Sequence, residues 1–277
     1  MSTPRSHHTH DHSAADQYTR GDLRERIEGA LRASGKDLGA LTPADLTPFE
    51  HFHSLGVLGT AGLLEAAGVL AGERVLDAGS GIGGTARLLA AQHDCQVVAV
   101  DLTPQFCEVA RWLDALVGLD ERVDVIEGDV TDLPFPDGAF DLVVSQHVQM
   151  NVADKEALYA ETRRVLRPGG RLALWDVTAG PEQPIRFPVP WADTPESSHL
   201  ATPDELRELL TGADLQPTIF NDLTDFAVKA MTPVLEGPPD PLGLQLVVPD
   251  ILEKGRAILT NANEHRLRLI QAVAVAV

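Results

Sequence analysis

The feature that most constrains this chain is an alternation, from residue 73 to residue 177, of short apolar runs with segments of helical spacing. The apolar runs, rich in Val, Leu and Ala, are Arg74–Leu76, Gln96–Val100, Val123–Ile126, Phe140–Ser145 and Arg171–Val177. The segments with helical spacing are Thr85–Gln92, Pro104–Leu119 and Leu158–Leu166. Strands without a polar face are buried on both sides, and helical crossovers join parallel neighbours. We therefore predict an α/β fold whose mostly parallel sheet carries helices on both faces.

The segments before this core predict a tail and a helical cap. Residues 1–17 are polar, rich in His and without apolar periodicity, which is typical of a disordered terminus. From residue 18 an apolar residue recurs every fourth position, at Leu23, Ile27 and Leu31. Residues 57–70 follow as a Leu- and Ala-rich buried helix. We therefore expect residues 18–70 to form an N-terminal helical cap.

The remainder, residues 71–277, is predicted to form the core domain, interrupted by one long connection. The Pro-rich stretch 178–202 exceeds an ordinary connection, and such loops commonly serve as lids over a site. Thr202 followed by Pro marks the start of a helix. Residues 215–220 and 269–277 read as the sixth and seventh strands, and the segment between them as helix and loop.

Composition excludes several classes of function. The 41 acidic and 22 basic residues give a net charge of -19, which disfavours binding to nucleic acid or to anionic lipid. Two cysteines, Cys95 and Cys107, are too few for a disulfide scaffold or a four-thiolate metal site. No apolar run reaches the ~18 residues of a membrane span, and the polar start predicts no secretory signal. We expect a cytoplasmic protein that acts on a small molecule.

The strongest local motif is the glycine-rich run 75–84, which lies between the first strand and the following helix. Glycines there allow a sharp turn close to a ligand, and the helix behind presents unpaired N–H groups. Two patterns fit this run: Gly79, Gly81 and Gly84 as G-x-G-x-x-G, or Asp77, Gly79, Gly81 and Gly83 as acidic-x-G-x-G-x-G. The run alone therefore leaves open which nucleotide-like cofactor is bound.

Two further carboxylates follow strands of the predicted sheet. Asp101 ends the second strand, where a carboxylate accepts hydrogen bonds from ribose hydroxyls. Asp129 follows the third strand, where a carboxylate can accept from an adenine amino group. Residues 133–141 then lead into the fourth strand, and Pro168–Gly170 predicts a turn before the fifth.

These segments, in this order, resemble the class I S-adenosylmethionine-dependent methyltransferases with a Rossmann-like sheet. The segments are VLDAGSGIGG, VVAVDLT, EGDVTDLPFPDGAFDLVVSQHV and VLRPGGRLAL, and the resemblance covers roughly residues 50 to 180. It implies seven strands that end in an antiparallel hairpin, and S-adenosyl-L-methionine as cofactor. The cofactor contacts that it implies are Asp77, Gly79, Gly81, Gly83, Asp101, Leu102, Asp129, Val130 and Gln146. The glycines would lie against the methionine part, Asp101 would hold the ribose, and Asp129 with Val130 would flank the adenine.

A narrower resemblance extends beyond that core. YTRGDLRERI, HFHSLG, SQHVQMNVADK and FPVPWA are similar to a bacterial subgroup that includes sarcosine and dimethylglycine N-methyltransferases and enzymes of specialised metabolism. In that subgroup the N-terminal helix caps the site, which implies that Tyr18 lies over the cofactor. Whether the helix caps its own subunit or a neighbour's in a homo-oligomer stays open.

Candidate residues for the acceptor side lie after strand four, in the cap and in the lid. His147 follows strand four, where ligands of α/β sheets bind, and its ordinary pKa suits a general base. The alternative is a histidine that only packs near the cofactor. The candidate substrate contacts are His53, Asn151, Phe187 and Trp191. His51 and His53 alternate along the chain, but no third ligand accompanies them, so we expect no metal.

The sequence thus predicts methyl transfer from S-adenosylmethionine to N, O or C of a small organic acceptor, a specialised metabolite with an apolar part. N-methylation of a small amino acid such as sarcosine or dimethylglycine is an alternative. An NAD(P)-dependent oxidoreductase is an alternative from another class, because Gly79, Gly81, Gly84 and Asp101 also fit its fingerprint. A binding protein that keeps the fold without chemistry is a third.

Overall fold

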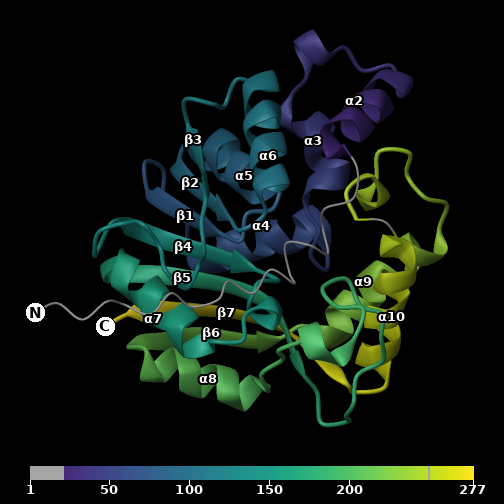
Figure 1. Ribbon diagram of the computed structural model, residues 1–277. Coiled ribbons are helices and arrows are strands. Elements are labelled where there is room, and N and C mark those ends of the chain that lie inside the picture. The colour runs from purple at the N-terminus through teal and green to yellow at the C-terminus, as the bar shows by residue number, and fades with distance from the viewer. Residues whose placement is uncertain (1–21, 249) are drawn as a thin grey trace, which may run out of the picture.

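A computed structural model describes residues 22–248 and 250–277, and within these ranges seven strands form one sheet (Figure 1). The strands are β1 (Arg74–Ala78), β2 (Gln96–Asp101), β3 (Val123–Glu127), β4 (Phe140–Gln146), β5 (Leu166–Ala179), β6 (Leu215–Asp222) and β7 (Leu267–Ala276). Their order is β3-β2-β1-β4-β5-β7-β6, and β7 runs antiparallel to both of its neighbours. The predicted fold, with its parallel core and final antiparallel hairpin, is confirmed.

Helices cover both faces of the sheet (Figure 1). One face carries α4 (Gly56–Ala67), α5 (Gly84–His93) and α6 (Pro104–Leu116), and the other carries α7 (Lys155–Val165) and α8 (Pro203–Gly212). Successive residues of a strand point to opposite faces, so Val75 belongs to the apolar cluster that includes α4 and α5, while Leu76 belongs to the cluster that includes α7 and α8. Because both faces of the sheet are buried, the strands appear in the sequence as continuous apolar runs.

The remaining helices gather around the cap and the end of the sheet. The predicted cap, residues 18–70, contains α2 (Leu23–Ala33), the 3-10 helix η1 (Leu38–Ala40) and α3 (Pro43–Glu50) as well as α4, which packs on β5 and β7 of the sheet. From here on, the cap denotes α2, η1 and α3. Near β7 lie α9 (Thr224–Glu236) and α10 (Ile251–Asn263), and the 3-10 helix η4 (Leu244–Leu246) between them in the chain packs against α2, α3 and α10. The periodic residues of α2 are fully buried against α6 and against residues 242–251. No helix of the described ranges is long and apolar enough to cross a membrane.

The turn predicted at Pro168–Gly170 lies inside the long strand β5. The pairing register shifts here, because Phe140 of β4 pairs with Leu166 and Leu142 pairs with Arg171. Gly169 has φ +73°, and a Cβ on Gly170 would lie 2.9 Å from the Arg167 carbonyl, so the chain turns sharply with a glycine in the left-handed conformation. The predicted turn is therefore an irregularity within the ladder, which starts at Leu166 as soon as α7 ends.

The stretch 178–202 is attached to α10 and to the segment that follows β4. Asn261 of α10 accepts from the Arg186 N–H at 2.7 Å and donates to the Arg186 carbonyl at 2.9 Å. The N–H of His199 donates to the Met150 carbonyl at 2.9 Å. These bonds give the predicted lid a defined position. The stretch also contains one short 3-10 helix, η3 (Pro195–Ser197).

A buried cation joins the cap to the core. Arg87 of α5 is fully buried, and its guanidinium pairs with Glu50 of α3 at 2.8 Å and with Asp114 of α6 at 2.8 Å. It also donates to the carbonyl of Ile82, inside the glycine-rich run. Burial raises the pKa of Glu50 and of Asp114, and the charge of Arg87 opposes this shift. One side chain thus connects the cap, α6 and the glycine loop.

We expect Arg87→Ala to lower the free energy of unfolding by about 3–5 kcal/mol, because two carboxyl groups would stay buried without a cation. Urea denaturation followed by circular dichroism measures the change. Arg32→Ala is the control, since it breaks an exposed pair between Arg32 and Glu28 of α2 and should cost no more than about 0.5 kcal/mol. Equal effects of the two substitutions would contradict a central role for Arg87.

Candidate functional site

The glycine loop turns beside β1 in left-handed backbone conformations. Gly79, Gly81 and Gly83 have φ values of +79°, +56° and +87°. A Cβ on Gly79 would overlap Val148, and one on Gly81 would lie 2.8 Å from the ring of Phe52. Glycine is therefore required here both by the backbone and by side chains that pack on the loop.

Asp101 ties this loop to the end of β2. Its carboxylate accepts from the N–H of Gly81 at 2.8 Å and from the N–H of Thr103 at 2.9 Å. Burial raises the pKa of Asp101, and these two hydrogen bonds oppose the shift. Each carboxylate oxygen has a second lone pair, so Asp101 retains acceptor capacity for the hydroxyls of a ligand.

Asp77 is the second carboxyl group beside the loop. It is buried at the end of β1, and its Oδ2 has no hydrogen-bond partner among the described residues. Burial raises the pKa of Asp77 to about 7, a backbone hydrogen bond from Ala86 opposes this, and the charge of Asp101 adds to it. A buried acceptor without a partner is costly, which marks Asp77 as a group that a ligand can satisfy.

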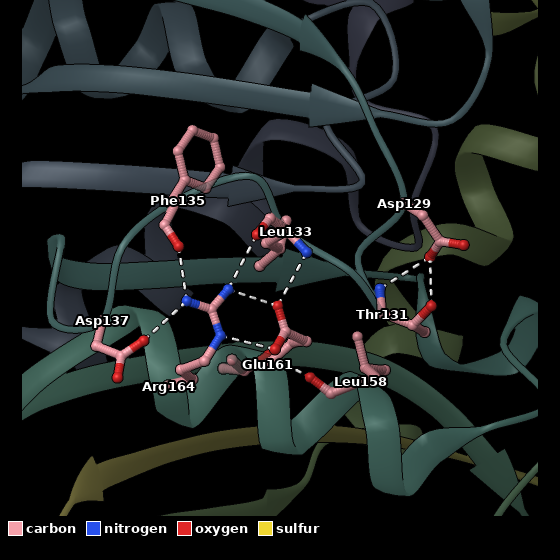
Figure 2. Close-up of polar contacts among 9 residues, drawn as sticks. Asp129, Thr131, Leu133, Phe135, Asp137, Leu158, Glu161 and Arg164 are labelled. Atoms are coloured by element: carbon pink, nitrogen blue, oxygen red, sulfur yellow. Dashed lines mark hydrogen bonds and ion pairs between the residues drawn. The ribbon is translucent and has the colours of Figure 1, made fainter. Parts of the chain in front are cut away.

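Asp129 lies in the connection after β3, where Figure 2 shows one of its oxygens joined to Thr131 and the other pointing away. The joined oxygen accepts from the Thr131 N–H at 2.8 Å and from the Thr131 hydroxyl at 2.7 Å. Val130 next to it is buried, and Leu102, after β2, is 37% exposed. The predicted adenine-side residues thus offer one free carboxylate oxygen and two apolar side chains.

The segment after β4 carries Gln146 and His147. Gln146 donates to the Thr85 hydroxyl at 2.7 Å, while its Oε1 is buried and unpartnered among the described residues. His147 has φ +56°, its N–H donates to the Trp175 carbonyl at 2.8 Å, and its Nε2 is likewise buried and unpartnered there. Val148, which packs on Gly79, places His147 beside the glycine loop.

His53 lies next to His147, at 5.9 Å between ring centroids, and both of its nitrogens are engaged by the protein. Its Nδ1 contacts the Ser54 carbonyl at 3.2 Å and must donate to it, so Nε2 accepts from the Thr60 hydroxyl at 3.0 Å. Burial lowers the pKa of His53 to about 4. His53 therefore offers a neutral ring surface to a substrate, whereas His147 offers a free nitrogen.

Asp176 of β5 is a residue that the sequence analysis missed. It is fully buried, and it accepts from the backbone N–H groups of Val148 at 3.0 Å, Gln149 at 3.1 Å and Val177 at 2.8 Å. It thereby holds the segment that carries His147. Burial raises the pKa of Asp176 to about 7, against the effect of these hydrogen bonds. A single Asp in an apolar strand was the available signal, because buried carboxylates require donors.

The other predicted substrate contacts are dispersed. Asn151 ends the 3-10 helix η2 (Gln149–Asn151), four residues after His147. Trp191 is buried in the core cluster against the sheet, with its Nε1 donating to Ser198 at 2.9 Å, and Phe187 packs on the same cluster. Their contacts with a substrate stay a prediction. Tyr18 lies outside the described residues.

No group of three His, Cys, Asp or Glu side chains within residues 22–248 and 250–277 is arranged to hold a metal ion.

Comparison with known proteins identifies the domain. Residues 76–174 match the family model described as a methyltransferase domain, so this part of the chain is a methyltransferase domain with the Rossmann-like fold. The resemblance found in the sequence is confirmed, in preference to the nicotinamide alternative. A similar relative is the sarcosine/dimethylglycine N-methyltransferase of Halorhodospira halochloris, 33% identical over 150 residues. The alignment spans 54% of this chain and 54% of that relative, so about half of each is matched.

Solved structures extend the fold comparison to the whole chain. Geranyl diphosphate C-methyltransferase from Streptomyces coelicolor A3(2), solved with S-adenosyl-L-homocysteine, matches with a TM-score of 0.71. The match covers 99% of this chain and 100% of that one at 18% identity. The [4+2]-cyclase SpnF matches with a TM-score of 0.60, covering 92% of this chain and 94% of its own at 20% identity. At such identities the likeness shows the fold alone.

The raised pKa of Asp77 predicts a pH dependence of stability. Its ordinary pKa is 3.8 and its folded pKa is about 7, so between these values the folded state binds more protons than the unfolded state. The free energy of unfolding should therefore fall as pH rises from about 4 to about 7, by about 1.4 kcal/mol for each unit of pKa shift.

Urea denaturation across this pH range tests the prediction. Asp77→Asn should reduce the slope and leave the part that comes from Asp176, whose pKa is also raised to about 7. Asp124→Asn, on the exposed side of β3, should leave the slope unchanged. An unaltered slope in Asp77→Asn would show that this carboxyl group is ionised in the folded state throughout the range.

Proposed function

We propose that this protein transfers the methyl group of S-adenosyl-L-methionine to a small organic acceptor. The observation that carries the proposal is the Gly81–Asp101 hydrogen bond, which brings the glycine loop against a carboxylate with spare acceptor capacity. Asp77 adds an unpartnered buried oxygen beside the same loop. The methyltransferase domain match over residues 76–174 supports the same activity.

The polar groups of the site fit the parts of this cofactor. Asp101 would accept from the ribose hydroxyls, and the free oxygen of Asp129 from the adenine amino group. Leu102 and Val130 would provide apolar contacts for the adenine ring. The free oxygen of Asp77 would face the ammonium of the methionine part, which would favour the ionised carboxylate.

On the acceptor side of the site, the proposed general base is His147. The bound cofactor supplies an electrophilic methyl group on a sulfonium, so the protein must align the acceptor and exclude water. Burial lowers the pKa of His147 well below its usual value, and the neighbouring His53 adds to this, so the imidazole is neutral. Its unpartnered Nε2 can accept the proton that an oxygen or carbon acceptor loses. A nitrogen acceptor with a free lone pair needs no such base.

Two classes of acceptor are proposed, a specialised metabolite and, as the alternative, a small amino acid. A specialised metabolite with an apolar part is supported by Phe187, which is partly buried on the core cluster, whereas Trp191 is fully buried within that cluster. The similar sarcosine/dimethylglycine N-methyltransferase supports the alternative of a small amino acid. We place the activity in the cytoplasm, which the two buried free thiols, Cys95 and Cys107, support.

Binding of the cofactor is the first test. Isothermal titration should detect S-adenosylmethionine and S-adenosylhomocysteine, and Asp101→Asn should weaken both by roughly 10-fold or more through loss of charge-assisted hydrogen bonds. Asp124→Asn is the matched control and should leave affinity unchanged. No binding of either compound at millimolar concentration would end the proposal. Binding without methyl transfer, in a screen of acceptors with a tritiated methyl donor, would favour a protein that keeps the fold without this chemistry.

The role of His147 is tested by His147→Asn, since asparagine tolerates the left-handed backbone found there. With an oxygen or carbon acceptor identified in that screen, we expect kcat to fall by about 10²–10⁴-fold while affinity for S-adenosylhomocysteine changes little. His265→Asn is the control, because His265 also has a positive φ, +59°, but is exposed and follows α10. An unchanged kcat would remove His147 from the mechanism.

A further inference from the structure

The connection between β3 and β4, residues 128–139, has no helix or strand of its own. Near its start lie Asp129 and Val130, the two residues proposed to contact the adenine. Irregular backbone keeps a fixed path only where its N–H and C=O groups find partners. Two side chains of α7, Glu161 and Arg164, supply partners for the middle of this connection (Figure 2).

Arg164 donates hydrogen bonds to two backbone carbonyls of the connection. One terminal nitrogen donates to the Phe135 carbonyl at 2.6 Å and to the Asp137 carboxylate at 3.0 Å. The other donates to the Leu133 carbonyl at 2.9 Å. The rigid fork of a guanidinium can serve these acceptors at once, which a lysine cannot do.

Glu161 completes the arrangement from the preceding turn of α7. Its carboxylate accepts from the backbone N–H of Leu133 at 2.9 Å and from Arg164 at 2.7 Å and 2.6 Å. These hydrogen bonds, Arg164 first, lower the pKa of Glu161, so the pair is ionised. Both the N–H and the C=O of Leu133 are thus bound to one helix.

The connection is therefore held at two places. Its start is attached to β2, where the Gly128 N–H donates to the Asp101 carbonyl at 3.0 Å, and its middle is attached to the Glu161–Arg164 pair. Between them, Asp129 accepts from Thr131 within the connection itself. The side chains of Val130 and Leu133 are buried in the same apolar cluster as Leu158 of α7. The direction of the free Asp129 oxygen depends on both attachments.

We infer that Glu161 and Arg164 are positioning residues for nucleobase recognition, which aim the free oxygen of Asp129 at the exocyclic amino group of a 6-aminopurine. The inference rests on the proposed function, because the ligand concerned is the adenosyl cofactor. A carboxylate accepts from an amino group but repels the carbonyl oxygen that replaces it in hypoxanthine. The pair should therefore control selectivity for adenine over hypoxanthine, not merely the stability of the fold.

Isothermal titration of the full chain with S-adenosylhomocysteine and S-inosylhomocysteine tests the inference. The wild type should prefer the adenine compound by roughly 10-fold or more, as expected for one hydrogen bond to a charged group. Arg164→Gln should weaken binding of the adenine compound by about 10-fold and change that of the hypoxanthine compound by less than about 2-fold. Arg164→Lys should be intermediate, because it keeps the charge but not the fork.

Two further variants keep the result interpretable. Arg207→Gln is the matched control, since Arg207 forms an exposed pair three residues from Asp204 on α8, and it should leave both affinities unchanged. If Arg164→Gln fails to fold, Glu161→Gln replaces it, because the amide oxygen can still accept from Leu133. This variant should show a smaller fall in selectivity.

The outcomes separate the inference from the function on which it rests. If the wild type binds neither compound, the proposed function fails. If the wild type binds both equally, or if Arg164→Gln weakens both by the same factor or neither, the positioning role is wrong. A selective loss for the adenine compound, partly restored by Arg164→Lys, supports it.

Discussion

The buried guanidinium of Arg87 is the interaction on which the arrangement of the site depends. It pairs with Glu50 from the cap and Asp114 from α6, and it binds the Ile82 carbonyl within the glycine loop. A buried cation without these partners would be strongly unfavourable. The three elements are therefore coupled in the folded state, because the loss of any one of them would leave a buried charge without a partner. The ring of Phe52, which follows α3, packs close to Gly81 of the same loop.

A second principle is that two of the groups proposed to face the ligand, His147 and Asp129, lie on segments that other side chains hold in place. Asp176 binds the backbone that follows His147, and Arg164 with Glu161 binds the connection that follows Asp129. These supporting groups are charged or buried side chains on β5 and α7, which are packed elements of the core. Precise orientation of a site requires such a second layer of contacts.

The fold by itself does not decide the chemistry. Its structural neighbours include a geranyl diphosphate C-methyltransferase and a [4+2]-cyclase. What distinguishes one function from another is the set of groups at the carboxyl ends of the strands. Here these groups are the Asp101 carboxylate, which ends β2 and binds the glycine loop, and two buried atoms without a partner among the described residues, Oδ2 of Asp77 and Nε2 of His147.

The sequence by itself determined the sheet, the order of helices and strands and the acidic residues at the strand ends, because local periodicity and glycine placement encode them. It also indicated His147. Only the tertiary structure decided that His53 has no free nitrogen, that Trp191 is buried, and that Asp176 and Arg164 support the site. These facts depend on partners far apart in the chain, and a sequence read locally contains no distance between them. The sequence also predicted the turn at Pro168–Gly170, but only the pairing of Leu166 and Arg171 with β4 shows that this turn lies within one long strand.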